Sequence, residues 1–261
     1  MISTLEKEIT LRFLKARKKD GFLNVISIFS FIGISLGVAV LIIVMSVMNG
    51  FRTELASKIL GFNAHIVVEP YSVPIDTKKL SSKELKNLSK DLMFTSTGEG
   101  VIIGKNTTKG VVLRGYSALD FQHLEFIKNG KFIGNSKKLN KNSVSIGKSL
   151  SLDYNLNVGD KLSIMSTTGV QTIIGTLPKQ ETYIITSIFE SGLSDFDLNV
   201  VFLNIKSLES LFDIEPSDRN LEIYLNNPLN IELNKKKVQK IFSQEFVYSW
   251  ADMNSSLFSA L

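Results

Sequence analysis

The sequence predicts an α+β domain attached to one N-terminal transmembrane α-helix. The first observation is a run of thirty-one residues, between Asp20 and Arg52, that contains no ionisable side chain. The second is the irregular alternation of helix-type and strand-type segments after that run, which favours α+β over a doubly wound sheet. The third is a composition of 44% hydrophobic and 21% charged residues, which is typical of a globular chain.

The charge-free segment is long enough to cross a membrane. About 20 apolar residues span a hydrocarbon core about 30 Å thick, and residues 21–51 exceed that length. A signal peptide fits poorly, because its apolar region has about 7–15 residues and ends at a small-residue cleavage site. The core helix of a soluble protein does not need so long a charge-free stretch. We therefore expect a membrane-spanning helix over residues 21–51.

The flanking charges predict the orientation of this helix. Residues 1–20 carry six Lys or Arg against three Asp or Glu, and short basic flanks stay on the cytoplasmic side. The remainder of the chain is then expected on the far side, which in a bacterium is the periplasm or the cell exterior. The absence of cysteine does not bear on this location. The overall net charge of +5 is too small to indicate a nucleic-acid partner.

Beyond the membrane span, apolar residues continue at three- and four-residue steps, so the helix is expected to continue as a stalk over residues 52–64 and to stop near Gly61. An α+β domain is expected over residues 65–252, and periodicity does not decide whether it forms one or two subdomains. Its predicted helices cover residues 81–92, a short segment before Val158, 205–212 and 228–242. Its predicted strands cover residues 65–69, 100–103, 110–113, 161–165, 183–189, 199–204, 221–225 and 246–248. Residues 253–261 resemble the start of a further helix.

The connection over residues 166–182 is apolar where a solvated connection is normally polar. It contains Val170, Ile173, Ile174 and Leu177, with Gly169, Gly175 and Pro178 among them. One interpretation is that these residues extend two strands back into the core. The other is a protruding hook, at about residues 166–180, whose apolar tip docks on a partner.

Candidate catalytic residues are few. With no cysteine and with His65 and His123 as the only histidines, a His/Cys metal site of familiar spacing is excluded, and a catalytic triad would depend on one of the two. Both histidines are interpreted as structural, and Asp195 and Asp197 as part of a solvated turn. The chain has no G-x-x-x-x-G-K-[ST] motif for nucleotide phosphates. We therefore expect no catalytic residue, no metal site and no cofactor in this chain.

Residues 12–65 resemble the amino-terminal signature of the transmembrane subunits of the bacterial lipoprotein-releasing ABC transporter, the LolC/LolE family. The matching elements are the basic run at Arg12–Lys18, GISLGV at Gly33–Val38, VMSVMNGF at Val44–Phe51 and ILGFNAH at Ile59–His65. Residues 146–165 and 174–197 resemble the periplasmic region of the same family. The MacB-type exporters share this layout more distantly.

The resemblance implies a subunit with four membrane helices, of which the first is present here and the second would start near residues 253–261. It implies a MacB-like periplasmic domain of two subdomains in the bacterial inner membrane. Two such transmembrane subunits would pair with a cytoplasmic ATPase dimer, which holds the ATP and Mg. They would extract lipoproteins from the outer leaflet and pass them to a periplasmic carrier. The alternative is a non-catalytic FtsX/MacB-like subunit that couples a cytoplasmic ATPase to a periplasmic partner without moving lipoproteins.

The resemblance also implies particular site residues. The segment from Gly169 to Lys179 matches the carrier-docking hook of the family, which here would use Val170, Ile173, Ile174, Leu177, Pro178 and Lys179. LolC and LolE differ in whether this hook binds the carrier, and the sequence favours the carrier-binding type. Acyl chains would contact an adaptable apolar face made of Val44, Met45, Met48 and Phe51, unless these residues pack on neighbouring helices. Gly33 and Gly37 form a small-xxx-small pair that permits close helix packing.

Overall fold

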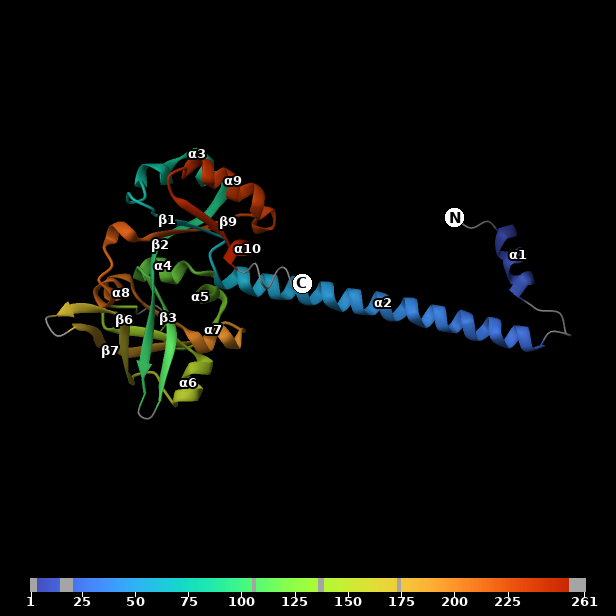
Figure 1. Ribbon diagram of the computed structural model, residues 1–261, viewed down its shortest axis with the longest axis horizontal. Coiled ribbons are helices and arrows are strands. Elements are labelled where there is room, and N and C mark those ends of the chain that lie inside the picture. Colours follow the sequence, from blue (N-terminus) through green and yellow to red (C-terminus); the bar gives the residue numbers. More distant parts are fainter. Residues whose placement is uncertain (1–3, 15–20, 105–106, 136–138, 173–174, 254–261) are drawn as a thin grey trace. The chain divides into compact units, whose positions relative to one another are not determined.

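The computed structural model describes residues 4–14, 21–104, 107–135, 139–172 and 175–253 (Figure 1). The chain divides into two compact units, residues 1–55 and 56–261. Its α-helices are α1 (Thr4–Leu14), α2 (Gly21–Phe62), α3 (Lys83–Leu88), α4 (Ala118–His123), α5 (Glu125–Asn129), α6 (Lys148–Tyr154), α7 (Ser194–Asn199), α8 (Ile205–Phe212), α9 (Ile231–Ile241) and α10 (Trp250–Met253). Its strands are β1 (Ile66–Glu69), β2 (Ser89–Ile103), β3 (Thr108–Tyr116), β4 (Lys131–Gly134), β5 (Ser143–Gly147), β6 (Lys161–Thr172), β7 (Gly175–Glu190), β8 (Val200–Asn204), β9 (Asn220–Leu225) and β10 (Phe246–Ser249).

The first unit consists of α1 and most of α2. Within α2, the segment Val25–Phe51 has a mean hydropathy of 2.8, and its apolar side chains are exposed. Its length and composition are sufficient to cross a membrane, and it is the one such helix among the described residues. The helix then continues through its charged part and ends at Phe62, so its last turn belongs to the second unit.

Six strands of the second unit pair in a closed ring among the described residues, which we call the barrel. The ring runs from the second half of β2 (Ser96–Ile103) through β3, β8, β5, β7 and β6 and back to β2. The pairings of β3 with β8 and of β5 with β7 are parallel, and the others are antiparallel. β4 adds to β7 outside the ring. The barrel sheet is therefore mixed.

Helix α8 closes one end of the barrel. Its apolar side chains Leu208, Leu211 and Phe212 pack into the same buried cluster as the inward-facing residues of the six strands. A Cβ added at Gly98 of β2 would lie 2.9 Å from the ring of Phe212, so only glycine allows this close approach. The helix is thus fixed by the barrel core.

The first half of β2 (Ser89–Thr95) belongs to a second, antiparallel sheet, which we call the small sheet. Its strand order is β10, β1, β9, β2. Figure 1 shows α3 and α9 near one another at this end of the second unit. Both sheets share β2, so the barrel and the small sheet form two connected parts of one compact unit.

Some predicted elements differ from the structure. The helix predicted over residues 81–92 ends at Leu88, because the following residues start β2 and pair with β9. The helix predicted over residues 228–242 begins only at Ile231, after a short 3-10 helix. Helices α4, α5 and α7 were not predicted. Residues 254–261, where a further membrane helix is expected, lie outside the described residues.

Candidate functional site

The connection predicted over residues 166–182 is not an irregular loop. It consists of the outer halves of β6 and β7, which pair with each other up to Thr172 and Gly175. Figure 1 shows these strand ends extending away from the other elements of the second unit. We call residues 169–178 the arm. Gly175 has a φ of +119°, a conformation that glycine adopts readily.

The arm exposes apolar side chains. Leu177 is 52% exposed, and Pro178 is exposed as well. Proline lacks the N–H that a ladder needs and is confined to edge positions in sheets, which agrees with a hairpin whose outer part extends from the barrel. Val170 is the backbone partner of Leu177, whereas Ile173 and Ile174 lie outside the described residues. Leu177 and Pro178 therefore do not extend the core.

A bulge lies at the base of the arm. Met165 pairs with Gln180 and Gly169 pairs with Pro178, so three residues of β6 lie opposite Lys179 alone. The Oγ of Ser166 accepts a 3.2 Å hydrogen bond from the backbone N–H of Lys179 and donates to the carbonyl of Thr168. Bulges bend strands and increase their twist. The direction of the arm is therefore determined at this point.

Three contacts connect this bulge to the rest of the domain. Thr167 Oγ1 donates a 2.7 Å hydrogen bond to the carbonyl of Glu99 in β2. Lys179 forms an ion pair with Asp213 and donates a 3.1 Å hydrogen bond to the carbonyl of Ser210, near the end of α8. The Lys179 side chain, expected on the carrier-docking hook, thus interacts with α8 in this structure.

The predicted lipid-facing residues lie on α2. Val44, Met45, Met48 and Phe51 recur at three- and four-residue steps and all four are exposed, which places them along one side of the helix. A Cβ added at Gly33 or Gly37 would meet no other atom within 4 Å. These glycines therefore leave room for another helix to approach closely.

The last turn of α2 is anchored by aromatic packing inside the second unit. The ring of Phe62 lies with its centroid 4.3 Å from that of Phe196 and 4.6 Å from that of Phe126. Phe189 and Phe202 belong to the same buried cluster. Aromatic pairs of this kind contribute about 0.5–1.5 kcal/mol each beyond the area that they bury. The end of α2 is consequently fixed to the domain core.

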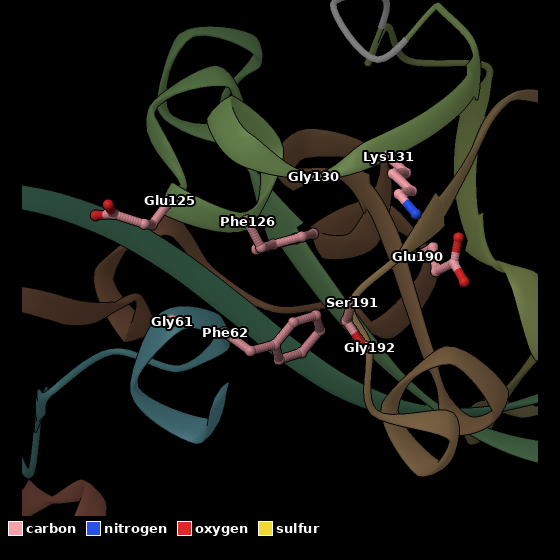
Figure 2. A pocket seen from close by; sticks show the side chains of 9 residues that line it. All are labelled: Gly61, Phe62, Glu125, Phe126, Gly130, Lys131, Glu190, Ser191 and Gly192. Carbon is pink, nitrogen blue, oxygen red and sulfur yellow. The ribbon is translucent and has the colours of Figure 1, made fainter. Parts of the chain in front are cut away.

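A cleft of about 420 Å³ lies beside this anchor. Figure 2 shows the rings of Phe62 and Phe126 close together on one side, with Lys131 and Glu190 on another. The complete lining is Gly61, Phe62, Glu125, Phe126, Gly130, Lys131, Glu190, Ser191 and Gly192. Glu125, Lys131 and Glu190 contribute the charged groups of this lining, and Phe62 and Phe126 contribute its aromatic surface.

A buried polar network connects the same turn of α2 to both sheets. Arg114 of β3 donates a 2.8 Å hydrogen bond to Glu222 of β9 and a 3.2 Å hydrogen bond to the side chain of Asn63. The hydroxyls of Tyr116 and Tyr224 each donate a 2.9 Å hydrogen bond to the other carboxylate oxygen of Glu222. Burial raises the pKa of both tyrosines. The network therefore contains neutral phenols around one compensated ion pair.

Sequence patterns did not reveal this network. Arg114 is the one charged residue in the stretch Val111–Tyr116, and a charge within an apolar strand is buried only when it is paired. That rule indicates a partner for Arg114. It does not identify Glu222, which is far away in the sequence.

The two histidines lie in different surroundings. His65 Nδ1 accepts a 2.8 Å hydrogen bond from the backbone N–H of Leu225, and burial lowers its pKa although a backbone hydrogen bond to Leu60 raises it. His123 is exposed, and it lines a second cleft of about 400 Å³ together with His65. Within the described part of the chain, no three His, Cys, Asp or Glu side chains are grouped so that they could hold a metal ion.

Asp197 does not lie in a solvated turn as predicted. It is buried in α7 and accepts hydrogen bonds from the backbone N–H and the hydroxyl of Ser191, at 2.9 and 2.6 Å. Burial raises its pKa, and the two hydrogen bonds oppose that effect. Asp195, in the first turn of the same helix, is exposed. Asp197 is thus a structural residue that holds the loop before α7.

The comparisons with known proteins define the class of this chain. The model of the family described as the MacB-like periplasmic core domain matches residues 27–241. The chain belongs to this family. Its predicted fold class, a MacB-like α+β domain with one N-terminal apolar helix, is confirmed.

Several relatives of this chain are named as proteins of the lipoprotein-releasing system. The lipoprotein-releasing system transmembrane protein LolC of Xylella fastidiosa (strain Temecula1 / ATCC 700964) is 24% identical over 233 residues, which cover 82% of this chain and 53% of that protein. LolC of Haemophilus influenzae is 26% identical over 255 residues, 97% of this chain and 63% of that protein. LolE of the same organism is 23% identical over 264 residues, 94% of this chain and 62% of that protein. The predicted resemblance to the LolC/LolE family is confirmed, and the chain spans between about half and two thirds of the length of these relatives.

Proposed function

We propose that this chain contains the first membrane-spanning helix and the periplasmic domain of a permease subunit that extracts lipoproteins from the outer leaflet of the inner membrane and passes them to a periplasmic carrier. The observation that supports this most directly is the arm, which exposes Leu177 and Pro178 away from the core. The relatives named as lipoprotein-releasing proteins support the same substrate class.

An exposed docking arm suits this task for a physical reason. Each methylene group of an acyl chain that enters water costs about 0.8 kcal/mol. A carrier that is already docked when the chains leave the bilayer shortens their path through water. We propose that Val170, Ile173, Ile174, Leu177 and Pro178 bind the carrier, and that they do so before the lipoprotein is released.

The membrane helix would contact the lipoprotein and a neighbouring helix. Val44, Met45, Met48 and Phe51 present an exposed apolar side of α2, and unbranched methionines adapt to acyl chains of variable shape. Gly33 and Gly37 would receive a helix of the second transmembrane subunit or of the same subunit. Residues 1–20 would lie in the cytoplasm and the domain in the periplasm.

The partners follow from the same proposal. A cytoplasmic ATPase dimer would hold ATP and Mg and supply the energy, so this chain would be non-catalytic. A second transmembrane subunit, homologous or identical, would complete the pathway. We propose that the last turn of α2 transmits movement to the domain, because the ring of Phe62 packs against those of four other phenylalanines and its carbonyl lies 3.5 Å from Arg114 Nη1.

The same anchor would serve the alternative, a subunit that transmits the ATPase stroke without moving lipoproteins. The two functions predict different products. Proteoliposomes that contain the whole permease, its ATPase and a triacylated lipoprotein should release that lipoprotein to added carrier only in the presence of ATP. Leu177→Asp should reduce the release while the lipoprotein stays bound. ATP hydrolysis without any release from the parent protein would favour the alternative.

A further inference from the structure

The arm depends on few contacts for its direction. Beyond the bulge, β6 and β7 pair with each other, whereas β2 pairs with β6 only from Ser163 to Ser166. A two-stranded hairpin by itself is marginally stable in water. The contacts at the bulge must therefore hold the arm in a defined orientation.

Lys179 is placed to provide such a contact. It is the residue of β7 opposite the three-residue bulge, and it directly follows Pro178. Its ammonium group reaches α8, where it meets the carboxylate of Asp213 and the carbonyl of Ser210. A cation near the last carbonyls of a helix is also favoured by the helix dipole.

Asp213, the partner of Lys179, directly follows a helix that packs into the barrel core. Helix α8 is fixed by Leu208, Leu211 and Phe212 in the barrel core. Asp213 caps the helix in the left-handed conformation, with a φ of 55°, and its backbone N–H donates to the carbonyl of Glu209. The backbone that carries the carboxylate of Asp213 is therefore held in place by α8.

We infer that Lys179 and Asp213 form a positioning pair that holds the arm against α8 and so determines how Leu177 and Pro178 face the carrier. This inference rests on the proposed function. It changes the expected role of Lys179, which acts through the arm and does not itself contact the carrier.

The expected effect is moderate. The side chains of Lys179 and Asp213 are 32% and 63% exposed, and water weakens an ion pair of this kind. Loss of the pair should weaken carrier binding by about two- to fivefold, which corresponds to the range of exposed ion pairs.

The test uses the full-length protein in nanodiscs with Lys179→Met, Asp213→Asn and the double variant. Methionine keeps the length of the lysine stem, and asparagine tolerates the left-handed conformation at residue 213. Lys90→Met is the matched control, because Lys90 forms a similarly exposed pair with Glu125, at 2.9 Å, away from the arm. Carrier affinity is measured for every variant.

A second measurement reports the orientation of the arm in the absence of the carrier. Residues 1–261 contain no cysteine, so spin labels at Leu177→Cys and Asp153→Cys give the distance distribution between the arm and α6, with any cysteine outside these residues replaced by serine. The distribution should broaden equally in Lys179→Met, Asp213→Asn and the double variant, and it should stay unchanged in Lys90→Met.

The affinities and distances distinguish a positioning pair from a direct contact between Lys179 and the carrier. Equal loss of affinity in both single variants, with no further loss in the double variant, supports the positioning pair. A loss in Lys179→Met with normal affinity in Asp213→Asn would show a direct carrier contact and overturn it, as would an unchanged distance distribution in all variants. A parent protein that does not bind the carrier contradicts the proposed function, and the distance measurement still decides on the pair.

Discussion

Arg114 and Glu222 form a buried ion pair across the junction of the barrel and the small sheet, with Nη2 2.8 Å from Oε1. Because the same guanidinium also contacts Asn63 and the carbonyl of Phe62, this pair joins three parts of the domain. A single side chain thus contacts the barrel, the small sheet and the end of α2.

Removal of one member of this pair should destabilise the domain strongly. Glu222→Gln leaves a buried, uncompensated guanidinium, and the free energy of unfolding should fall by about 3–5 kcal/mol. Thermal unfolding can be followed by the fluorescence of Trp250, the only tryptophan of this chain. The control Lys90→Met removes an exposed pair and should cost less than about 1 kcal/mol. Similar values for the two variants would contradict the proposed importance of the network.

Leu177→Asp should weaken carrier binding at least tenfold. Burial of a leucine side chain at an interface contributes about 1.5–3 kcal/mol, and a carboxylate in its place adds a desolvation cost. The melting temperature should remain almost unchanged, because Leu177 is 52% exposed. Leu152→Asp is the control, since Leu152 is 71% exposed on α6 and away from the arm. Ile174→Asp should behave like Leu177→Asp. Unfolding of the domain by these changes would place the residues in the core.

The stability of the domain should decrease below pH 6.5 in a way that depends on His65. Burial lowers the pKa of His65, so the folded state binds fewer protons than the unfolded state between the lowered value and 6.5. Stability is thus lost as the pH falls through this window, and a difference of one pKa unit corresponds to about 1.4 kcal/mol. His65→Asn keeps an acceptor for the Leu225 N–H but does not titrate.

The measurement compares unfolding at pH 7.5 and pH 5 in parent, His65→Asn and the exposed-site control His123→Asn. The difference between the two pH values should shrink in His65→Asn alone. The raised pKa of Asp197 acts in the opposite direction, because its protonated form is favoured in the folded state, and it is common to all three proteins. An equal difference in all three would exclude His65 as the cause.

The orientation of the chain can be tested with a reporter inserted after Leu261. Alkaline phosphatase needs an oxidising compartment for its disulfides, and it should be active at this position if the basic residues 1–20 lie in the cytoplasm as proposed. Replacement of Lys15, Arg17, Lys18 and Lys19 by glutamine should lower the activity. Activity of a cytoplasmic reporter at the same position would reverse the proposed orientation.

The purified chain should not hydrolyse ATP. It lacks the G-x-x-x-x-G-K-[ST] motif whose backbone N–H groups and lysine hold nucleotide phosphates. A phosphate-release assay on the chain alone should match buffer, with the reconstituted ATPase as the positive control. Turnover that persists through a second purification step would contradict the non-catalytic role.

Elements with clear signals within their own segment were predicted correctly. A segment whose structure depends on pairing with a distant part of the chain was not. The helix predicted over residues 205–212 agrees with α8, because its apolar period and its capping residue Asn204 are local signals. The strand predicted over residues 221–225 agrees with β9 to within one residue. The segment Ser89–Leu92 has a helical pattern but is a strand, since its pairing partner β9 comes from a distant part of the chain.

In the candidate site, too, contacts between distant segments could not be predicted from the sequence. Gly169, Gly175 and Pro178 indicate breaks in regular structure, yet two paired strands include all three residues. The apolar character of the segment was visible in the sequence. The contact between Lys179 and Asp213 was not, because it depends on how the barrel places α8 next to the bulge.

The strand order of the small sheet imposes a sequence of assembly on the domain. All barrel strands come from the continuous stretch Ser96–Asn204, whereas β1 pairs with β9 and β10, which come after the barrel strands in the sequence. Barrel contacts can form during synthesis, and pairings between distant segments form late. The 3.0 Å hydrogen bond from the backbone N–H of Trp250 to the carbonyl of His65 joins the two ends of the domain. A chain interrupted before Phe246 would consequently hold a folded barrel beside an open sheet, which exposes β1 to pairing with other chains.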